Sequence, residues 1–184
     1  MIKRRGLVIQ LLILVGFICM ASISVVNAQE PTQIVSLNLG GFILGVPGVE
    51  YQNNIDDSAA WAIRGNYMSI GTGDWKWSAT GVGGSYKGFF SPTAPAGGYW
   101  DVGVDILMMK AEYKYTTLTS KTETASSTFF APGAGAGYQW LFENFGVSAG
   151  AKIVYFAGSI EIAGTKLPLS GVTPGGVLQL GYAW

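Results

Sequence analysis

Apolar residues recur at every second position of this chain, and this period restricts its fold more than any other feature. The clearest segment is 100–108, where five large apolar residues alternate with Asp101, Gly103 and Asp105. Successive side chains of a strand point to opposite faces, so this period indicates β-strands, whereas a helix repeats every three to four residues. The sequence therefore predicts an all-β chain. We count eight such segments, at about 33–43, 49–54, 59–69, 77–90, 100–108, 129–142, 145–157 and 172–184.

The bulky residues gather on one face of these segments, and glycine or polar residues occupy the other. In segment 129–142, for example, Tyr138 and Trp140 alternate with Gly137 and Gln139. The strands of a soluble β-sandwich also alternate between apolar and polar residues, but there the bulky side chains lie on the buried face. Here charged residues are only 12% of the chain, about half the usual share. This distribution predicts that the bulky side chains face lipid and that the small residues face a narrow interior.

Hydrocarbon leaves no water to pair with the backbone, so a β-protein that crosses it must close into a barrel. Eight strands enclose a space that side chains can just fill. The sequence therefore predicts an eight-stranded antiparallel up-and-down transmembrane β-barrel. Large aromatic residues near the predicted strand ends suggest girdles at the two membrane surfaces. They are Trp61, Tyr67, Trp77, Phe90, Trp100, Tyr138, Trp140, Tyr155 and Trp184.

The first residues have the pattern of a secretory signal. Three basic residues precede an apolar stretch of about 7–23, and small or compact residues lead to Ala28. We predict a signal peptide at 1–28, cleaved after Ala28, and a barrel domain at 29–184. The only cysteine, Cys19, would leave with the signal, so the mature chain would hold no disulfide. The alternative is an uncleaved anchor that holds a soluble periplasmic barrel.

Six charged residues of both signs fall on the polar face of the predicted strands. Lys87 and Asp101 lie on neighbouring strands at similar distances from one turn, and Glu50 and Arg64 flank another. Buried charges must be paired, so we predict a mixed-sign network that fills the lumen. A conducting or ligand-lined path is the alternative. The predicted network comprises Glu50, Arg64, Lys87, Asp101, Asp105 and Lys152.

Composition restricts the possible chemistry. The chain has no histidine, which excludes a Ser–His nucleophile and a histidine-built zinc site. We expect no enzyme, no cofactor and no metal. Eleven basic and eleven acidic residues do not provide the positive charge that nucleic-acid binding favours. Three longer polar segments, at 69–76, 116–128 and 158–170, are predicted to be extracellular loops, where barrels carry function.

The last residues resemble the C-terminal signal of bacterial outer-membrane barrels. Leu178, Leu180 and Tyr182 alternate with small or polar residues and lead to Trp184. Residues 31–184 resemble the small eight-stranded barrels of the OmpA-like transmembrane domain and opacity-type porin family. The resemblance implies an outer-membrane location, contact with outer-membrane lipid, and recognition of these four residues by the barrel-assembly machinery. It implies a structural or surface-interaction role, with a narrow porin-like channel or a lipophile-binding conduit as the alternative.

Overall fold

The computed structural model describes residues 31–39, 47–115, 121–162 and 165–184. The predicted signal peptide at 1–28, with its cleavage after Ala28, lies outside these residues. So does the end of the first predicted strand, at 40–43.

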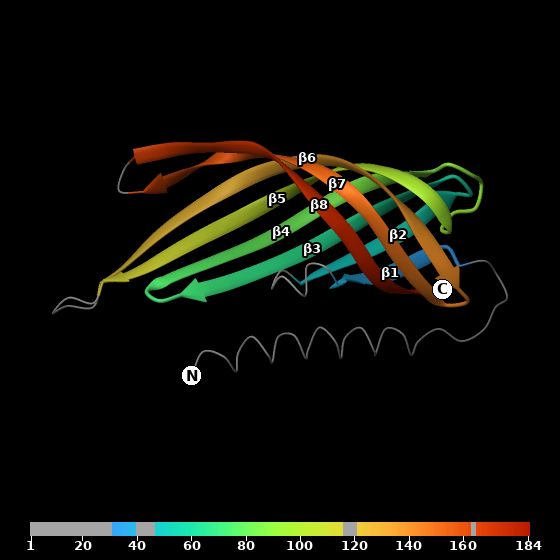
Figure 1. Cartoon of the computed structure of the whole chain (residues 1–184), viewed down its shortest axis with the longest axis horizontal. Coiled ribbons are helices and arrows are strands. Elements are labelled where there is room, and N and C mark those ends of the chain that lie inside the picture. Colours follow the sequence, from blue (N-terminus) through green and yellow to red (C-terminus); the bar gives the residue numbers. More distant parts are fainter. Residues whose placement is uncertain (1–30, 40–46, 116–120, 163–164) are drawn as a thin grey trace. The chain divides into compact units, whose positions relative to one another are not determined.

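Eight strands form a closed barrel in which each strand pairs antiparallel with the next and β1 pairs with β8 (Figure 1). The predicted eight-stranded antiparallel barrel is therefore confirmed. Within the described part of the chain, no helix has the length and apolar character needed to span a membrane. The strands are β1 (Gln33–Asn38), β2 (Gly48–Asp56), β3 (Ala59–Thr72), β4 (Trp75–Phe89), β5 (Gly97–Tyr115), β6 (Lys121–Phe142), β7 (Phe145–Ile162) and β8 (Thr165–Ala183).

Several strands are much longer than the sequence predicted. β6 begins at Lys121 and β8 at Thr165, so the expected polar loops at 116–128 and 158–170 are largely strand. The loop expected at 69–76 is mostly strand too, since β3 runs to Thr72 and β4 starts at Trp75. Threonine is a favourable strand residue, and a polar side chain does not prevent backbone pairing. The change to polar residues therefore shows where the apolar part of each strand ends, and the strand itself continues further.

The outward and inward faces alternate along each strand. On β4, Val82 is 57% exposed and Lys87 is 4% exposed. Trp77 corrects one prediction. It shares the inward face of Lys87 and pairs with the buried Ala111, so it is not part of an outward aromatic girdle. Trp77 is ten residues before Lys87, so the alternation along the predicted strand already places both residues on the same face.

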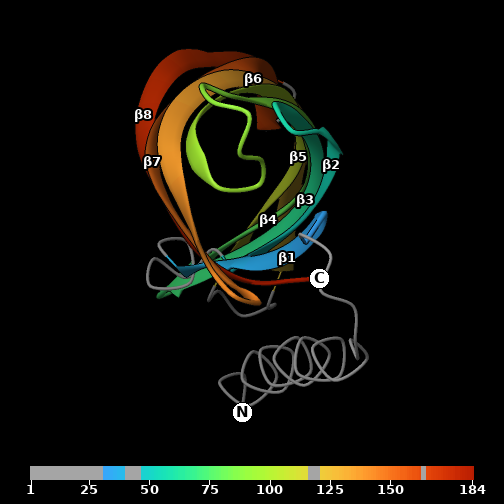
Figure 2. The same ribbon diagram turned by 90° about the vertical axis from the view of Figure 1, so that its right-hand side faces the viewer.

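One connection bends into the barrel at the end where β8 finishes. Figure 2 shows the yellow-green segment between β4 and β5 inside the ring of strands. Its Ala94 N–H donates to the Asp57 carbonyl at 2.9 Å. The same residue packs against a buried cluster of Ala60, Phe89 and Tyr99. These contacts narrow the lumen at this end of the barrel.

Candidate functional site

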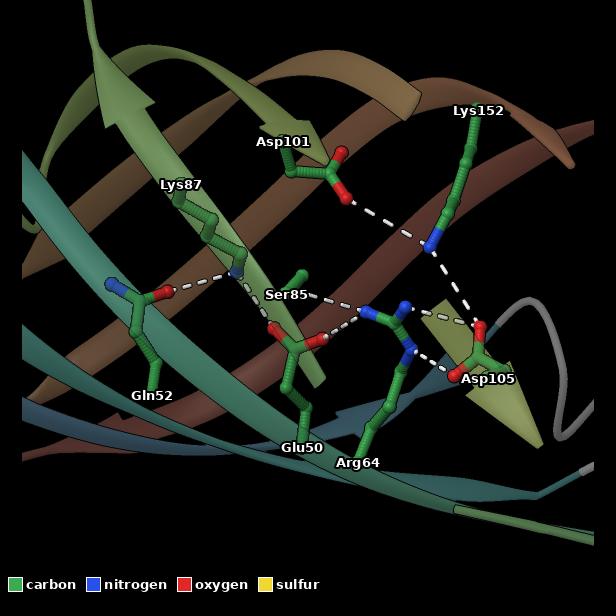
Figure 3. A network of polar contacts seen from close by, with 8 residues as sticks. All are labelled: Glu50, Gln52, Arg64, Ser85, Lys87, Asp101, Asp105 and Lys152. Atoms are coloured by element: carbon green, nitrogen blue, oxygen red, sulfur yellow. Dashed lines mark hydrogen bonds and ion pairs between the residues drawn. The ribbon is translucent and has the colours of Figure 1, made fainter. Parts of the chain in front are cut away.

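The most distinctive site is a set of ionic and polar side chains inside the barrel (Figure 3). All six charged residues expected on the lumen face lie there, and together they contribute three positive and three negative groups. Strand β2 provides Glu50, β3 provides Arg64, β4 provides Lys87, β5 provides Asp101 and Asp105, and β7 provides Lys152.

Arg64 is the centre of the network. Its Nε and Nη2 donate to the two carboxylate oxygens of Asp105 at 2.6 and 3.0 Å. Its Nη1 donates to Ser85 Oγ at 3.2 Å and lies 3.8 Å from Glu50 Oε2. A guanidinium in this two-pronged geometry forms one of the stronger kinds of charge-assisted contact. One side chain therefore links β2, β3, β4 and β5.

Lys87 completes the cluster nearer the narrowed end. Its ammonium donates to Glu50 Oε1 at 2.6 Å and to Gln52 Oε1 at 2.8 Å. It also lies 5.3 Å from the centre of the Tyr99 ring, within the range of a cation–π contact. Lys87 and Glu50 are both buried, so each charge depends on protein partners in place of water.

Lys152 is held more loosely. Its Nζ lies 3.8 Å from Asp101 Oδ2 and 4.0 Å from Asp105 Oδ2. These are ion-pair distances rather than hydrogen bonds. Lys152 approaches from β7, on the opposite side of the lumen from Arg64 in Figure 3. Asp105 therefore connects the two sides.

Glycines on the inner face make room for these side chains. Gly83 lies in register between Arg64 and Asp105, and a Cβ added there would collide with Asp105 Oδ1. Gly135 lies in register between Asp101 and Lys152, and a Cβ there would meet Asp101 Oδ1 at 2.5 Å. The inward glycines thus leave open the space through which the ionic side chains reach their partners on other strands.

Sequence reasoning did not identify three neutral partners of the charges. Gln52 and Ser85 share the inward parity of the charges, so the alternation that placed the charges on the lumen face places these two residues there as well. Tyr99 precedes the predicted start of its strand at Trp100. Extending the same alternation by one residue would have placed its ring on the lumen side.

The outer face carries a belt of large apolar side chains. It is composed of exposed residues from β3 to β8 whose side chains face away from the charges. The belt includes Trp61, Ile63, Tyr67, Val82, Tyr86, Trp100, Val102, Ile106, Met108, Phe130, Tyr138, Trp140, Ile153, Tyr155, Val172 and Leu178.

The C-terminal residues singled out in the sequence lie along β8 and just beyond it. Leu178 is 41% exposed, whereas the intervening Gln179 is buried. Leu180 and Tyr182 share the outward parity of Leu178, and Trp184 follows the end of the strand at Ala183. The Asn144 side chain also donates to the Ala183 carbonyl at 2.9 Å, which fixes the last residue of β8 against the β6–β7 turn.

The described residues include no cluster of three or more His, Cys, Asp or Glu side chains that could hold a metal ion. The inner acids instead face Lys and Arg. Their carboxylate oxygens are therefore already engaged by cations of the chain itself.

No protein-family model matches the chain, and no curated protein sequence does. Solved structures align with most of it, among them the following three. The N-terminal β-barrel domain of Pseudomonas aeruginosa OprF is 14% identical, with a TM-score of 0.44, covering 85% of this chain and 98% of that one.

The β-domain of the Bordetella autotransporter BrkA is 14% identical, with a TM-score of 0.44, covering 83% of this chain and 69% of that one. The Yersinia pestis outer-membrane protein Ail is 15% identical, with a TM-score of 0.41, covering 84% and 100%. The barrel assignment rests on the strand pairing of this chain itself.

Proposed function

We propose that this chain is a non-enzymatic outer-membrane β-barrel with a closed lumen and a structural or surface-interaction role. One observation carries the proposal: the apolar side chains face outward while the buried charges face inward. This is the reverse of a soluble protein, where the hydrophobic effect places the bulk inside. A lipid environment removes the cost of exposing the outer belt.

The strands are long enough for one end of the barrel to project beyond the proposed membrane. A membrane-crossing strand needs about 9–11 residues, whereas β5 has 19 and β6 has 22. The apolar part of β5 ends at Met108, and Lys110 and Glu112 follow on the same face. In the proposed orientation the termini face the periplasm. The β3–β4, β5–β6 and β7–β8 hairpins then project outside the cell.

The lumen contacts support a closed interior. The six charges pair among themselves, and the segment between β4 and β5 narrows one end. Ions would have to displace these pairs in order to pass. The proposal includes export through the secretory pathway with cleavage after Ala28. It also includes assembly directed by Leu178, Leu180, Tyr182 and Trp184.

Membrane fractionation with a heat-modifiability gel tests the location. A folded barrel in the outer-membrane fraction should migrate differently before and after boiling. N-terminal sequencing of that protein should begin at Gln29. A soluble protein, or one that remains in the inner membrane with its N-terminus intact, would instead favour the anchored periplasmic barrel and reject the proposal.

Ion flux through lipid vesicles tests the closed lumen. The wild-type chain should conduct little, and Lys87→Met or Asp101→Asn should raise the flux or lower the stability. Lys76→Met is the matched control, because Lys76 is half exposed and pairs with Glu112 on the outer face. If neither lumen variant differs from wild type in flux or stability, the network does not close the barrel.

A narrow channel is the second candidate function. The looseness of Lys152, at 3.8 and 4.0 Å from its two partners, favours it. Movement of this one side chain would open a path beside Asp105 without breaking the Arg64 contact. Steady single-channel currents from the wild-type chain, increased by Lys152→Ala because the side chain that has to move is gone, would favour the channel over the closed barrel.

A further inference from the structure

The outward side chains of β4, β5 and β6 change from apolar to polar over three successive rows. Because the strands pair in register, each row runs along the hydrogen bonds across all three strands. The lowest is Val82, Ile106 and Phe130. The second is Thr80, Met108 and Thr128. The third is Ser78, Lys110 and Ser126. This change marks where the proposed hydrocarbon ends and head groups begin.

A groove lies beside the two polar rows, where the pairing between β6 and β7 ends. The β6–β7 pairing begins with Phe129 opposite Gly158. Just beyond this pair, the Ser127 hydroxyl donates to the Ser159 carbonyl. The groove has a volume of about 730 Å³, within the usual range for small-molecule sites. Among the described residues, six with hydroxyl groups line it: Ser78, Thr80, Ser126, Ser127, Thr128 and Ser159.

The described lining also includes one cation and two apolar residues. Among the lining residues that the structure describes, Lys110 is the only charged one, and Met108 and Met109 are the apolar ones. Lys110 and Lys76 share one carboxylate, since Glu112 lies 2.8 Å from the former and 3.8 Å from the latter. Lys110 remains half exposed beside Glu112, so its ammonium can also donate to an anion in the groove.

We propose that this groove binds the head group of a phosphorylated glycolipid in the outer leaflet, an inference that rests on the proposed membrane location. The hydroxyl residues can exchange hydrogen bonds with sugar hydroxyls, and Lys110 can bind a phosphate. Ile106 and Phe130, one row below, are exposed and offer a surface to the acyl chains. The polar head group of such a ligand would thus lie beside the polar rows, and its acyl chains would lie beside the apolar row.

Native mass spectrometry of the folded, detergent-solubilised chain tests the inference. The probes are lipid A, which is a phosphorylated glucosamine lipid, and phosphatidylglycerol, which has a phosphate but no sugar ring. Inorganic phosphate with free glucosamine serves as a soluble competitor. Lipid A should bind about tenfold more tightly than phosphatidylglycerol, as expected for several additional hydrogen bonds. The soluble competitor should not displace it at millimolar concentration.

Two groove variants and one control identify the residues. Lys110→Gln should weaken lipid A binding about tenfold, the effect of losing one charge-assisted contact. Ser126→Ala with Thr128→Val should reduce the preference for lipid A over phosphatidylglycerol. Lys76→Gln is the control, because Lys76 is equally exposed and pairs with the same Glu112 but does not line the groove. It should leave binding within about twofold.

Equal affinity for the two lipids, equal loss in Lys110→Gln and Lys76→Gln, or displacement by the soluble competitor would each overturn the inference. Each variant is first tested for heat-modifiability and vesicle insertion, so a misfolded variant is recognised. A wild-type chain that does not insert rejects the proposed function itself. A chain that inserts normally but does not prefer lipid A rejects only the glycolipid groove.

Discussion

Arg64 binds Asp105 through two hydrogen bonds of 2.6 and 3.0 Å, although strand β4 lies between the strands that carry them. The residue of β4 that separates them in register is Gly83. A side chain at that position would occupy the space through which Asp105 reaches Arg64. This two-pronged ion pair of the lumen therefore depends on the absence of a third side chain.

Gly83→Ala should destabilise the barrel by about 3 kcal/mol, because the new Cβ would displace the Asp105 carboxylate from Arg64 and would also crowd the Val104 carbonyl at 2.7 Å. Urea unfolding of the chain in lipid vesicles measures this. Gly84→Ala is the control on the same strand, since its Cβ would meet only the Ala62 carbonyl at 3.6 Å. Equal midpoints for the two variants would show that the gap is not required.

The Glu50–Lys87 pair should show strong coupling in a double-mutant cycle. Glu50→Gln and Lys87→Met should each cost about 3 kcal/mol, since each leaves a buried charge without its partner. The double variant should cost about 2 kcal/mol less than the sum. The Lys110–Glu112 pair on the outer face, in which the Lys110 side chain is half exposed, is the comparison, and its coupling should not exceed about 0.5 kcal/mol. Similar coupling in both pairs would contradict a buried, mutually dependent network.

Cysteine labelling should reveal the orientation of the barrel. The only cysteine, Cys19, lies in the predicted signal peptide, so single cysteines can be introduced into a thiol-free mature chain. Thr124→Cys on the long β5–β6 hairpin should react with an impermeant maleimide on intact cells. Ser91→Cys, exposed at the opposite end of the barrel, should react only after the outer membrane is permeabilised. The reverse result would place the long hairpins in the periplasm.

Deletion of Trp184 should lower the amount of folded protein in the outer membrane, because the proposed assembly signal loses its terminal aromatic residue. Heat-modifiability of membrane fractions from cells measures the loss. The same variant refolded into lipid vesicles without the machinery is the control, and it should fold as wild type does. If both experiments show the same defect, Trp184 stabilises the barrel and is not a signal.

The sequence alone predicted the architecture and the side of the wall on which each charge lies. Alternation with a period of two is a property of the local backbone, so it assigns Glu50, Arg64 and Lys87 to one face without knowledge of their neighbours. It could not locate the strand ends. At 121–128 the Ser/Thr-rich segment pairs with β5, and pairing depends on a partner strand rather than on hydropathy.

Only the tertiary structure decided which charges meet. Lys87 and Asp101 are opposite each other in register, yet Lys87 binds Glu50 across β3 and Asp101 faces Lys152 on β7. The curvature of a closed eight-stranded wall brings inward side chains from non-adjacent strands together, and the gaps at Gly83 and Gly135 let them lean across. Alternation along one strand determines the side of a residue, but contact partners depend on the three-dimensional closure of all eight.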